Sequence, residues 1–354
     1  MLKNDTFFPI RYEKTRPFLK ELNSLANGKK SAELFQTDNT MIFQNIIFDE
    51  MVKAEEKLPI GILGDEKSFN LKLARELNYY WFYYTWLKNG KNNFYFKKEL
   101  LTMFEFSDVD KIPFSTIKMP FDSFYISFSD LDRMFGIDTA GTEIYIDGVM
   151  VVKNFNKDNQ LDFFLNAFTK NSKKSKDWLL NKFASLYGDW FRINYNLDTD
   201  TLKNTGFIPK FLDNNANENL TEGTRIFFSQ VVNLILNSIC YLSSPIEKPR
   251  SAWPDGAPKN LTEKAQNGTT KRKREVAISE LQNKGYTQVK IFGESYKTSN
   301  SNLETKNVAS HWRRGHWRNQ PFRTENETKL IWIKPTIINK EKGKPEKGKI
   351  YNVE

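Results

Sequence analysis

The sequence predicts an α+β protein with a mostly helical N-terminal domain that carries an inserted β-hairpin, a linker, and a small basic β-rich C-terminal domain. Helical spacing of apolar residues early in the chain, alternation in its middle, and a Pro- and Gly-containing stretch before short β-like runs support this prediction. We place the three parts at residues 1–244, 245–274 and 275–354. With 29 Phe, 14 Tyr and 8 Trp among 354 residues, the chain can fill a substantial core.

The first hundred residues are predicted to be helical. Residues 33–50 and 68–88 carry apolar side chains three and four positions apart, with few helix breakers. The second segment contains an almost uninterrupted aromatic run from Tyr79 to Trp86. Aromatic side chains on every side of a helix favour burial between other elements. The alternative is a platform that stacks on a ligand or engages another protein.

The middle of the chain is predicted to form strands. Residues 121–128 and 143–152 alternate between apolar and polar side chains, and Asp147-Gly148 between two apolar arms predicts the type I′ turn of a hairpin. Several acidic residues fall in this region, namely Asp122, Asp130, Asp132 and Asp138. They lack Glu or His partners at ligand spacing, so we expect turn and cap residues and predict no metal site. No phosphate-binding glycine loop is recognisable, and we predict no cofactor.

Helices are predicted to resume at residues 175–190 and 222–242. The second is apolar enough to be a central buried helix, and it contains Cys240, the only cysteine. A lone cysteine excludes an intrachain disulfide, and in an apolar run it is expected to act as a small hydrophobic residue. The three Pro and two Gly of residues 248–270 indicate a linker.

The positive charge is concentrated near the C-terminus. Residues 271–354 contain 19 Lys and Arg against 9 Asp and Glu, so the rest of the chain has 34 of each and the whole net charge of +10 lies in the last quarter. Such segregation indicates a surface that meets a polyanion, and a solvated basic tail is the alternative. The mean hydropathy of −0.61 and the absence of a long apolar run predict a cytoplasmic protein without a membrane partner.

Both histidines of the chain lie in a repeated triplet, His311-Trp312-Arg313 and His316-Trp317-Arg318, separated by Arg314 and Gly315. In a regular strand, positions five apart face opposite sides of the sheet. A bulge or tight turn at Gly315 would bring the two triplets into phase and place His311 and His316 on one side. We therefore treat this repeat as the candidate site.

Three interpretations of the repeat are open. In the first, the guanidinium groups of Arg313, Arg314 and Arg318 bind phosphate and Trp312 and Trp317 stack on bases, together with the basic run Lys271, Arg272, Lys273 and Arg274. In the second, His311 and His316 act as general base and general acid in metal-independent RNA cleavage. In the third, the tryptophans pack the small domain while the His and Arg side chains contact loop carbonyls.

The repeat also resembles the C-terminal motif of a family of uncharacterised proteins from phages, plasmids and integrated elements. The resemblance rests on residues 311–320 and on Lys329-Leu330-Ile331-Trp332-Ile333-Lys334-Pro335. Weaker similarity extends to residues 121–128 and 233–244, while residues 321–323 depart from the expected pattern. The resemblance implies a mobile-element setting and a modular plan but no mechanism.

The leading hypothesis is a nucleic-acid-binding protein of a phage, plasmid or antiphage system, with DNA and RNA both open as partners. The first alternative is a toxin-like endoribonuclease that uses His311 and His316, so the sequence leaves open whether the chain is an enzyme. The second alternative is a protein-binding inhibitor or assembly module that engages another protein through the aromatic N-terminal domain. Binding to phosphate should weaken steeply with salt, whereas an apolar protein contact should not.

Overall fold

The computed structural model describes most of the chain between residues 7 and 338. The described residues are 7–29, 33–35, 37–55, 66–109, 112–113, 116–131, 134–137, 143–154, 160–169, 189–194, 208–209, 222–244, 246–296, 311–313, 315–321 and 328–338. Helices and strands are mixed along the described chain, which confirms the predicted α+β class.

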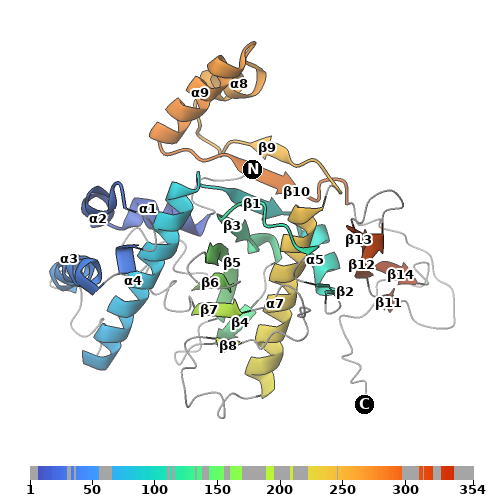
Figure 1. Cartoon of the computed structure of the whole chain (residues 1–354), viewed down its shortest axis with the longest axis horizontal. Helices are drawn as coiled ribbons and strands as arrows, with labels where there is room; N and C mark the ends of the chain where they lie inside the picture. The colour runs from blue at the N-terminus through green and yellow to red at the C-terminus, as the bar shows by residue number, and fades with distance from the viewer. Residues whose placement is uncertain are drawn as a thin grey trace.

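A mixed nine-stranded sheet forms the centre of the protein (Figure 1). Its strands, in spatial order, are β8 (Ile208–Pro209), β7 (Asp189–Asn194), β6 (Gln160–Thr169), β5 (Glu143–Asn154), β3 (Ser123–Ser127), β1 (Asn93–Phe96), β10 (Val289–Phe292) and β9 (Arg250–Ala252), with β4 (Met134–Ile137) also paired to β5. Strand β1 runs parallel to both β3 and β10, and the other pairs are antiparallel. Residues far apart in the sequence therefore share one sheet.

One face of the sheet is covered by the N-terminal helices. They are α1 (Phe8–Thr15), α2 (Leu19–Ala26), α3 (Thr37–Glu55) and α4 (Glu66–Lys88), with the short 3-10 turn η2 (Glu33–Phe35). The predicted helices at 33–50 and 68–88 thus correspond to α3 and α4. Arg16, just after α1, makes a buried ion pair with Glu76 of α4 at 3.2 Å, which fastens these two helices together.

The opposite face packs against α5 (Lys98–Glu105) and α7 (Glu222–Ser243) (Figure 1). Helix α5 buries Leu100, Leu101 and Phe104, and the apolar C-terminal half of α7 is buried as predicted for residues 222–242. The predicted helix at 175–190 lies mostly outside the described residues, and its last two residues, Asp189 and Trp190, begin strand β7. Across the described part of the chain, the helices are too short or too polar to cross a membrane.

The predicted hairpin turn at Asp147-Gly148 is wrong. Strand β5 runs through both residues, and the pairing of β5 with β6 shifts between Ile146 and Gly148, which marks a bulge. A Cβ atom at Gly148 would overlap the carbonyl oxygen of Ile126 and the ring of Tyr125. The glycine is thus required because neighbouring atoms approach closely, and not because a turn needs positive φ.

Residues 253–288 connect β9 to β10 and contain a helical hairpin, α8 (Lys259–Asn267) and α9 (Lys271–Asn283). The interval expected to be a linker, 245–274, therefore contains β9, α8 and the first turn of α9. Figure 1 shows this hairpin extending away from the sheet beyond β9 and β10. We call residues 253–286 the arm.

The remaining strands form two small sheets beside α5 and α7, and we call their four C-terminal strands the meander (Figure 1). Strand β12 (Gly315–Pro321) pairs with β13 (Thr328–Ile333) and with β2 (Ser107–Asp108), whereas β11 (His311–Arg313) pairs with β14 (Thr336–Ile338). The division of the chain into three domains stays a prediction.

Candidate functional site

The His-Trp-Arg repeat is divided between two sheets. The first triplet forms β11, and the second lies in β12, while Arg314 between them is outside the described residues. Strand β12 pairs with β13 in a register that places Trp317 opposite Trp332, His316 opposite Ile333 and Arg318 opposite Ile331. Because side chains alternate along a strand, the tryptophans share one face and the other four residues share the opposite face.

The inner face of this pair belongs to the core. Trp317 and Trp332 are buried, and their rings stack with centroids 5.9 Å apart and planes 20° apart. The Nε1 atom of Trp332 donates a hydrogen bond to Oγ of Ser107 at 3.0 Å. The prediction that Trp317 stacks on a nucleic-acid base is therefore wrong, since this ring has no access to one.

Asn237 of α7 connects the meander to two other elements. Its Oδ1 atom accepts a hydrogen bond from Nε1 of Trp317 at 2.8 Å, and its Nδ2 donates to the carbonyl oxygens of Ser107 and Phe104 at 3.0 and 3.3 Å. Asn237 is completely buried. An asparagine in the buried half of α7 was the sequence signal for this contact, because a buried amide needs partners for both of its polar atoms.

Gly315 begins β12 at a point of close contact. Its N–H donates to the carbonyl oxygen of Phe106 at 2.9 Å, and a Cβ atom at this position would lie 2.5 Å from Cδ of Pro335 and 2.8 Å from the carbonyl oxygen of Ile333. The residue is glycine because a side chain would not fit. The predicted in-phase arrangement of His311 and His316 stays untested, because the side chain of His311 lies outside the described set.

The outer face of β12 and β13 is exposed. It presents three cross-strand pairs, His316 with Ile333, Arg318 with Ile331, and Gln320 with Lys329. Ile331 and Ile333 each keep 36% of their surface exposed, which is high for large apolar side chains. We call His316, Arg318, Lys329, Ile331 and Ile333 the β12–β13 face.

The other predicted phosphate contacts are split between separate places. Arg313 is exposed on β11, while Lys271, Arg272 and Lys273 are exposed on the first turn of α9. Figure 1 shows the arm and the meander at different sides of the molecule, so these groups do not form one site. Arg274 has a structural contact, because its guanidinium donates to the carbonyl oxygen of Gly268 at 2.8 Å.

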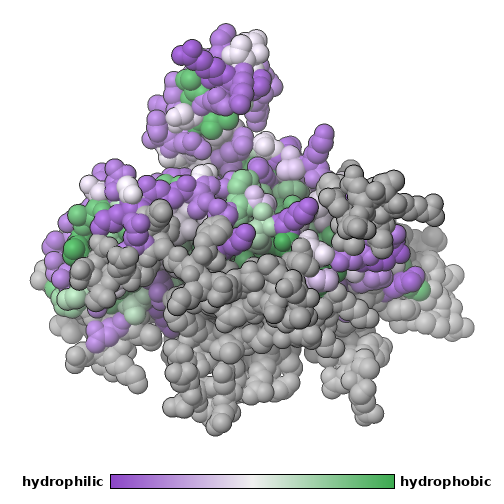
Figure 2. Space-filling view, in the orientation of Figure 1, coloured by the Kyte–Doolittle hydropathy of each residue, from purple (hydrophilic) through white to green (hydrophobic). Residues whose placement is uncertain are grey.

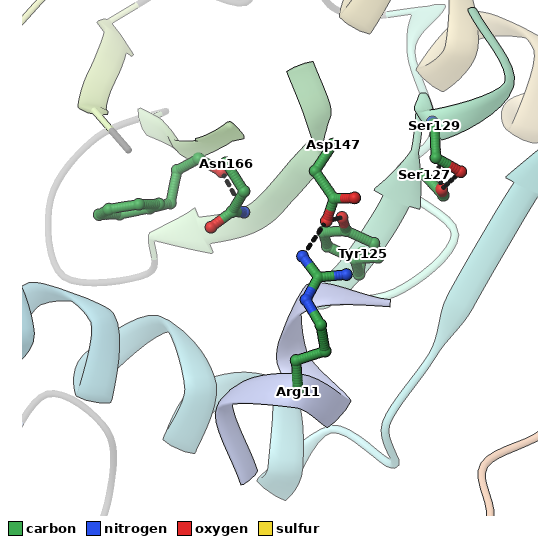
Figure 3. A network of polar contacts seen from close by, with 7 residues as sticks. Arg11, Tyr125, Ser127, Ser129, Asp147 and Asn166 are labelled. Atoms are coloured by element: carbon green, nitrogen blue, oxygen red, sulfur yellow. Dashed lines mark hydrogen bonds and ion pairs between the residues drawn. The ribbon is translucent and has the colours of Figure 1, made fainter. Parts of the chain in front are cut away.

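A polar network that the sequence did not indicate lies under α1 (Figure 3). One carboxylate oxygen of Asp147 accepts hydrogen bonds from Arg11 of α1 and from the hydroxyl group of Tyr125 of β3, both at 2.8 Å. Asp147 and Tyr125 are completely buried, and the Arg11 side chain keeps 15% of its surface exposed. Burial raises the pKa of Tyr125 well above its usual range, and the charge of Asp147 raises this pKa further. The neutral phenol therefore persists as a donor to the carboxylate.

This network connects α1 to strands β3 and β5 of the sheet. A buried carboxylate is stable only when donors or cations surround it, and Arg11 supplies the cation from a different element. Because Asp147 and Tyr125 are sealed from solvent, we infer a structural role and no substrate contact. The bulge at Asp147 and Gly148 explains how the carboxylate comes to face α1.

The aromatic run of α4 is part of the core. Tyr79, Tyr80, Phe82, Tyr83, Tyr84 and Trp86 are buried, and only Trp81 is partly exposed. Phe164 of β6 packs against Tyr79 and Phe82, which connects the helix to the sheet. The structure therefore supports the core interpretation, and these rings are not available to a partner protein. Within the described residues, His, Cys, Asp and Glu side chains form no cluster of three or more that could hold a metal.

Residues 94–340 match the AcrVA2-like family, described as the anti-CRISPR type V subtype A2 family. A solved structure titled "Crystal structure of AcrVA2" is 12% identical, and the alignment covers 92% of this chain and 100% of that one with a TM-score of 0.36. A search of curated proteins found no match.

The family match supports the phage or mobile-element setting that the sequence resemblance implied. It opposes the antiphage interpretation, because an anti-CRISPR family counters a bacterial defence, and it gives no support to a toxin. Nucleic-acid binding and catalysis by the His-Trp-Arg repeat stay untested predictions. Because the match spans well over half of the sequence, the chain belongs to the AcrVA2-like anti-CRISPR type V subtype A2 family.

Proposed function

We propose that this protein is a phage-derived inhibitor of a type V CRISPR system and that it acts by binding a protein of that system. The observation that carries the proposal is the family match over residues 94–340. The matched segment includes most of the central sheet, α7 and the meander, whereas α1 to α4 lie before it. We therefore place the inhibitory surface within this segment and outside α1 to α4.

The β12–β13 face is our candidate for that surface. Its two exposed isoleucines lie across the strands from His316 and Arg318, so apolar side chains lie beside an imidazole and a guanidinium group on a short rigid sheet. Protein interfaces combine an apolar centre with arginine in this way. The stacked tryptophans behind the face fix its position on α7 through Asn237. A surface held rigidly in this way loses little conformational entropy on binding.

The inhibitory function is tested in bacteria that carry a type V CRISPR system. Cells with and without the protein are challenged with a targeted plasmid, and transformation efficiency is measured. We expect the protein to raise the efficiency toward that of an untargeted plasmid. Unchanged interference by type V systems in the presence of folded protein would reject the proposed function.

The location of the interface is tested with Ile331→Glu/Ile333→Glu. This change places two carboxylates on the proposed face and should abolish inhibition and effector pull-down. The matched control is Ile42→Glu on α3, an exposed isoleucine outside the family-matched segment, which should leave both unchanged. Thermal unfolding of each variant is measured to check that the fold is retained. Full inhibition by the double variant would place the interface elsewhere.

A further inference from the structure

The arm is built as a separate unit with a small core of its own. Leu261 and Ala265 of α8 pack against Ala277 and Leu281 of α9, with Trp253, Ala257, Ile278 and Tyr286 around them. The Tyr286 hydroxyl donates to the carbonyl oxygen of Gly256 at 2.8 Å and closes the base of the hairpin. Antiparallel pairing of β9 with β10 fixes the arm to the edge of the central sheet. The core of the sheet therefore does not depend on the arm.

The free end of the arm is strongly basic. Between residues 259 and 284 there are seven Lys and Arg against three Glu. Lys264, Lys271, Arg272 and Lys273 are exposed around the turn at residues 268–270, which is the end of the hairpin opposite β9 and β10. Uncharged hydrogen-bonding side chains lie between these charges, namely Gln266, Asn267, Thr269 and Thr270. We call this group of residues, 264 to 273, the arm tip.

The stability of the arm does not explain these charges. The first turn of α9 contains no acidic residue, so Lys271, Arg272 and Lys273 lie at the positive end of the helix dipole, where cations destabilise a helix. The helix is started by the Thr270 hydroxyl, which accepts a hydrogen bond from the backbone N–H of Lys273. The ion pair between Lys271 and Glu275 is long, at 3.7 Å, with the two side chains 84% and 62% exposed. Such an exposed pair contributes little.

We propose that the arm tip binds the phosphate backbone of a nucleic acid. Adjacent cations on a short rigid helix match the closely spaced charges of a polynucleotide, and amide and hydroxyl side chains are common phosphate donors. An anionic membrane is the less suitable partner, because the apolar residues of the arm, apart from the exposed Val276, pack into its internal core and leave no broad apolar surface. Figure 2 shows hydrophilic residues over most of the visible surface of the arm. This proposal does not depend on the proposed inhibition.

The test is fluorescence anisotropy of the full-length protein with labelled 20-nucleotide RNA and DNA, each single- and double-stranded, between 50 and 300 mM salt. We expect binding that weakens as salt rises. Lys271→Ala/Arg272→Ala/Lys273→Ala should weaken binding roughly ten-fold or more at low salt. It should also reduce the steepness of log affinity against log salt by about 2 to 3, since each of the three lost phosphate contacts removes roughly 0.7 to 0.9. Arg274 is kept because it supports the turn.

Three further variants make the result specific. Lys20→Ala/Lys98→Ala/Lys118→Ala removes the same charge from exposed positions of the body and should bind like the unchanged protein. Replacing residues 254–286 by a short Asn-Gly turn keeps the β9–β10 pair and should reduce binding at least as much as the triple variant. Arg313→Ala/Arg318→Ala tests whether the arginines of the meander contribute to nucleic-acid binding.

Equal weakening by the body variant, or full binding by the arm variants, would overturn the proposal, because the effect would then come from net charge or from the meander. Absence of binding to all four nucleic acids would overturn it as well. Preference for one of the four identifies the partner class. CRISPR inhibition is measured separately with the same proteins, so loss of one activity is distinguishable from loss of the other.

Discussion

The indole ring of Trp317 stacks on that of Trp332 across β12 and β13, and the two N–H groups donate to different elements, Asn237 of α7 and Ser107 of β2. Each tryptophan thus supplies buried apolar area and one directed hydrogen bond. The pair holds the C-terminal meander on the core formed by α5 and α7. The residues of the β12–β13 face lie on the other side of the same strands, so the tryptophan pair also fixes their positions.

Removal of one ring should therefore destabilise the protein. We expect Trp317→Ala to lower the free energy of unfolding by about 3–5 kcal/mol, the usual range for a buried tryptophan. Trp317→Phe keeps much of the apolar area but removes the donor to Asn237, and a loss of about 1–3 kcal/mol is expected. Urea unfolding measures both. His316→Ala, on the exposed side of the same strand, is the control and should change stability by less than about 0.5 kcal/mol. Similar values for the three variants would contradict the buried role.

Gly148 should tolerate no side chain. A Cβ atom there would lie 2.6 Å from Cζ of Tyr125 and would also overlap the carbonyl oxygen of Ile126. We expect Gly148→Ala to cost more than about 2 kcal/mol or to prevent folding, because the contact involves backbone and a buried ring. Gly28→Ala is the comparison, since Gly28 has a φ of +82° but open space around it. It should cost only about 1–2 kcal/mol, as measured by thermal or urea unfolding.

Arg11 and Asp147 should be energetically coupled. Arg11→Met leaves the buried carboxylate without its cation and is expected to cost about 3–5 kcal/mol. Asp147→Asn should cost less in an Arg11→Met background than in the unchanged protein, because it then removes a buried carboxylate that has already lost the Arg11 cation. A double-mutant cycle by urea unfolding measures the difference, expected to exceed about 1 kcal/mol. Additive effects would show that the ion pair contributes nothing.

Cys240 should be unreactive in the folded protein. The thiol is completely buried on α7, and burial raises its pKa far above the ordinary value. The thiolate is the nucleophile, so labelling by a disulfide reagent at pH 8 should be slow and should accelerate sharply on unfolding in urea. Rapid labelling without denaturant would contradict this burial.

The same shift in the pKa of Cys240 has a consequence for stability. The folded state keeps the thiol proton at pH values where the unfolded chain releases it, so deprotonation favours the unfolded state. Below about pH 8.5, the ordinary thiol pKa, the thiol is protonated in both states and the folded protein keeps its full stability. Above that value the unfolded chain loses the proton, and the free energy of unfolding falls as pH rises. Cys240→Ala should show a weaker fall when unfolding is measured between pH 8 and 10. An identical pH dependence in both proteins would contradict the assignment.

Local patterns were sufficient for several elements. The helices α3, α4 and α7 follow from apolar spacing, and strand β3 follows from the alternation at residues 121–128, because both patterns depend on neighbours in the sequence. The arm was not predictable in the same way. The Pro and Gly content around residues 249–268 masks α8, and its few apolar residues become informative only when α9 packs beside them. The turn prediction at Asp147-Gly148 was wrong for a related reason. A glycine in a sequence can be required either by a positive φ or by the close approach of neighbouring atoms, and the sequence does not show which.

The sequence by itself determined the α+β class, the buried central helix and the segregation of basic charge, since composition and periodicity are properties of the chain alone. Only the tertiary structure decided which residues between 311 and 335 are buried and which are exposed. Trp317 and Arg318 are adjacent in sequence, yet one is fixed against Asn237 in the core and the other is exposed beside Ile331. Strand pairing and the position of α7 made that choice, because a strand sends successive side chains to opposite faces and only the packed structure determines which face is buried.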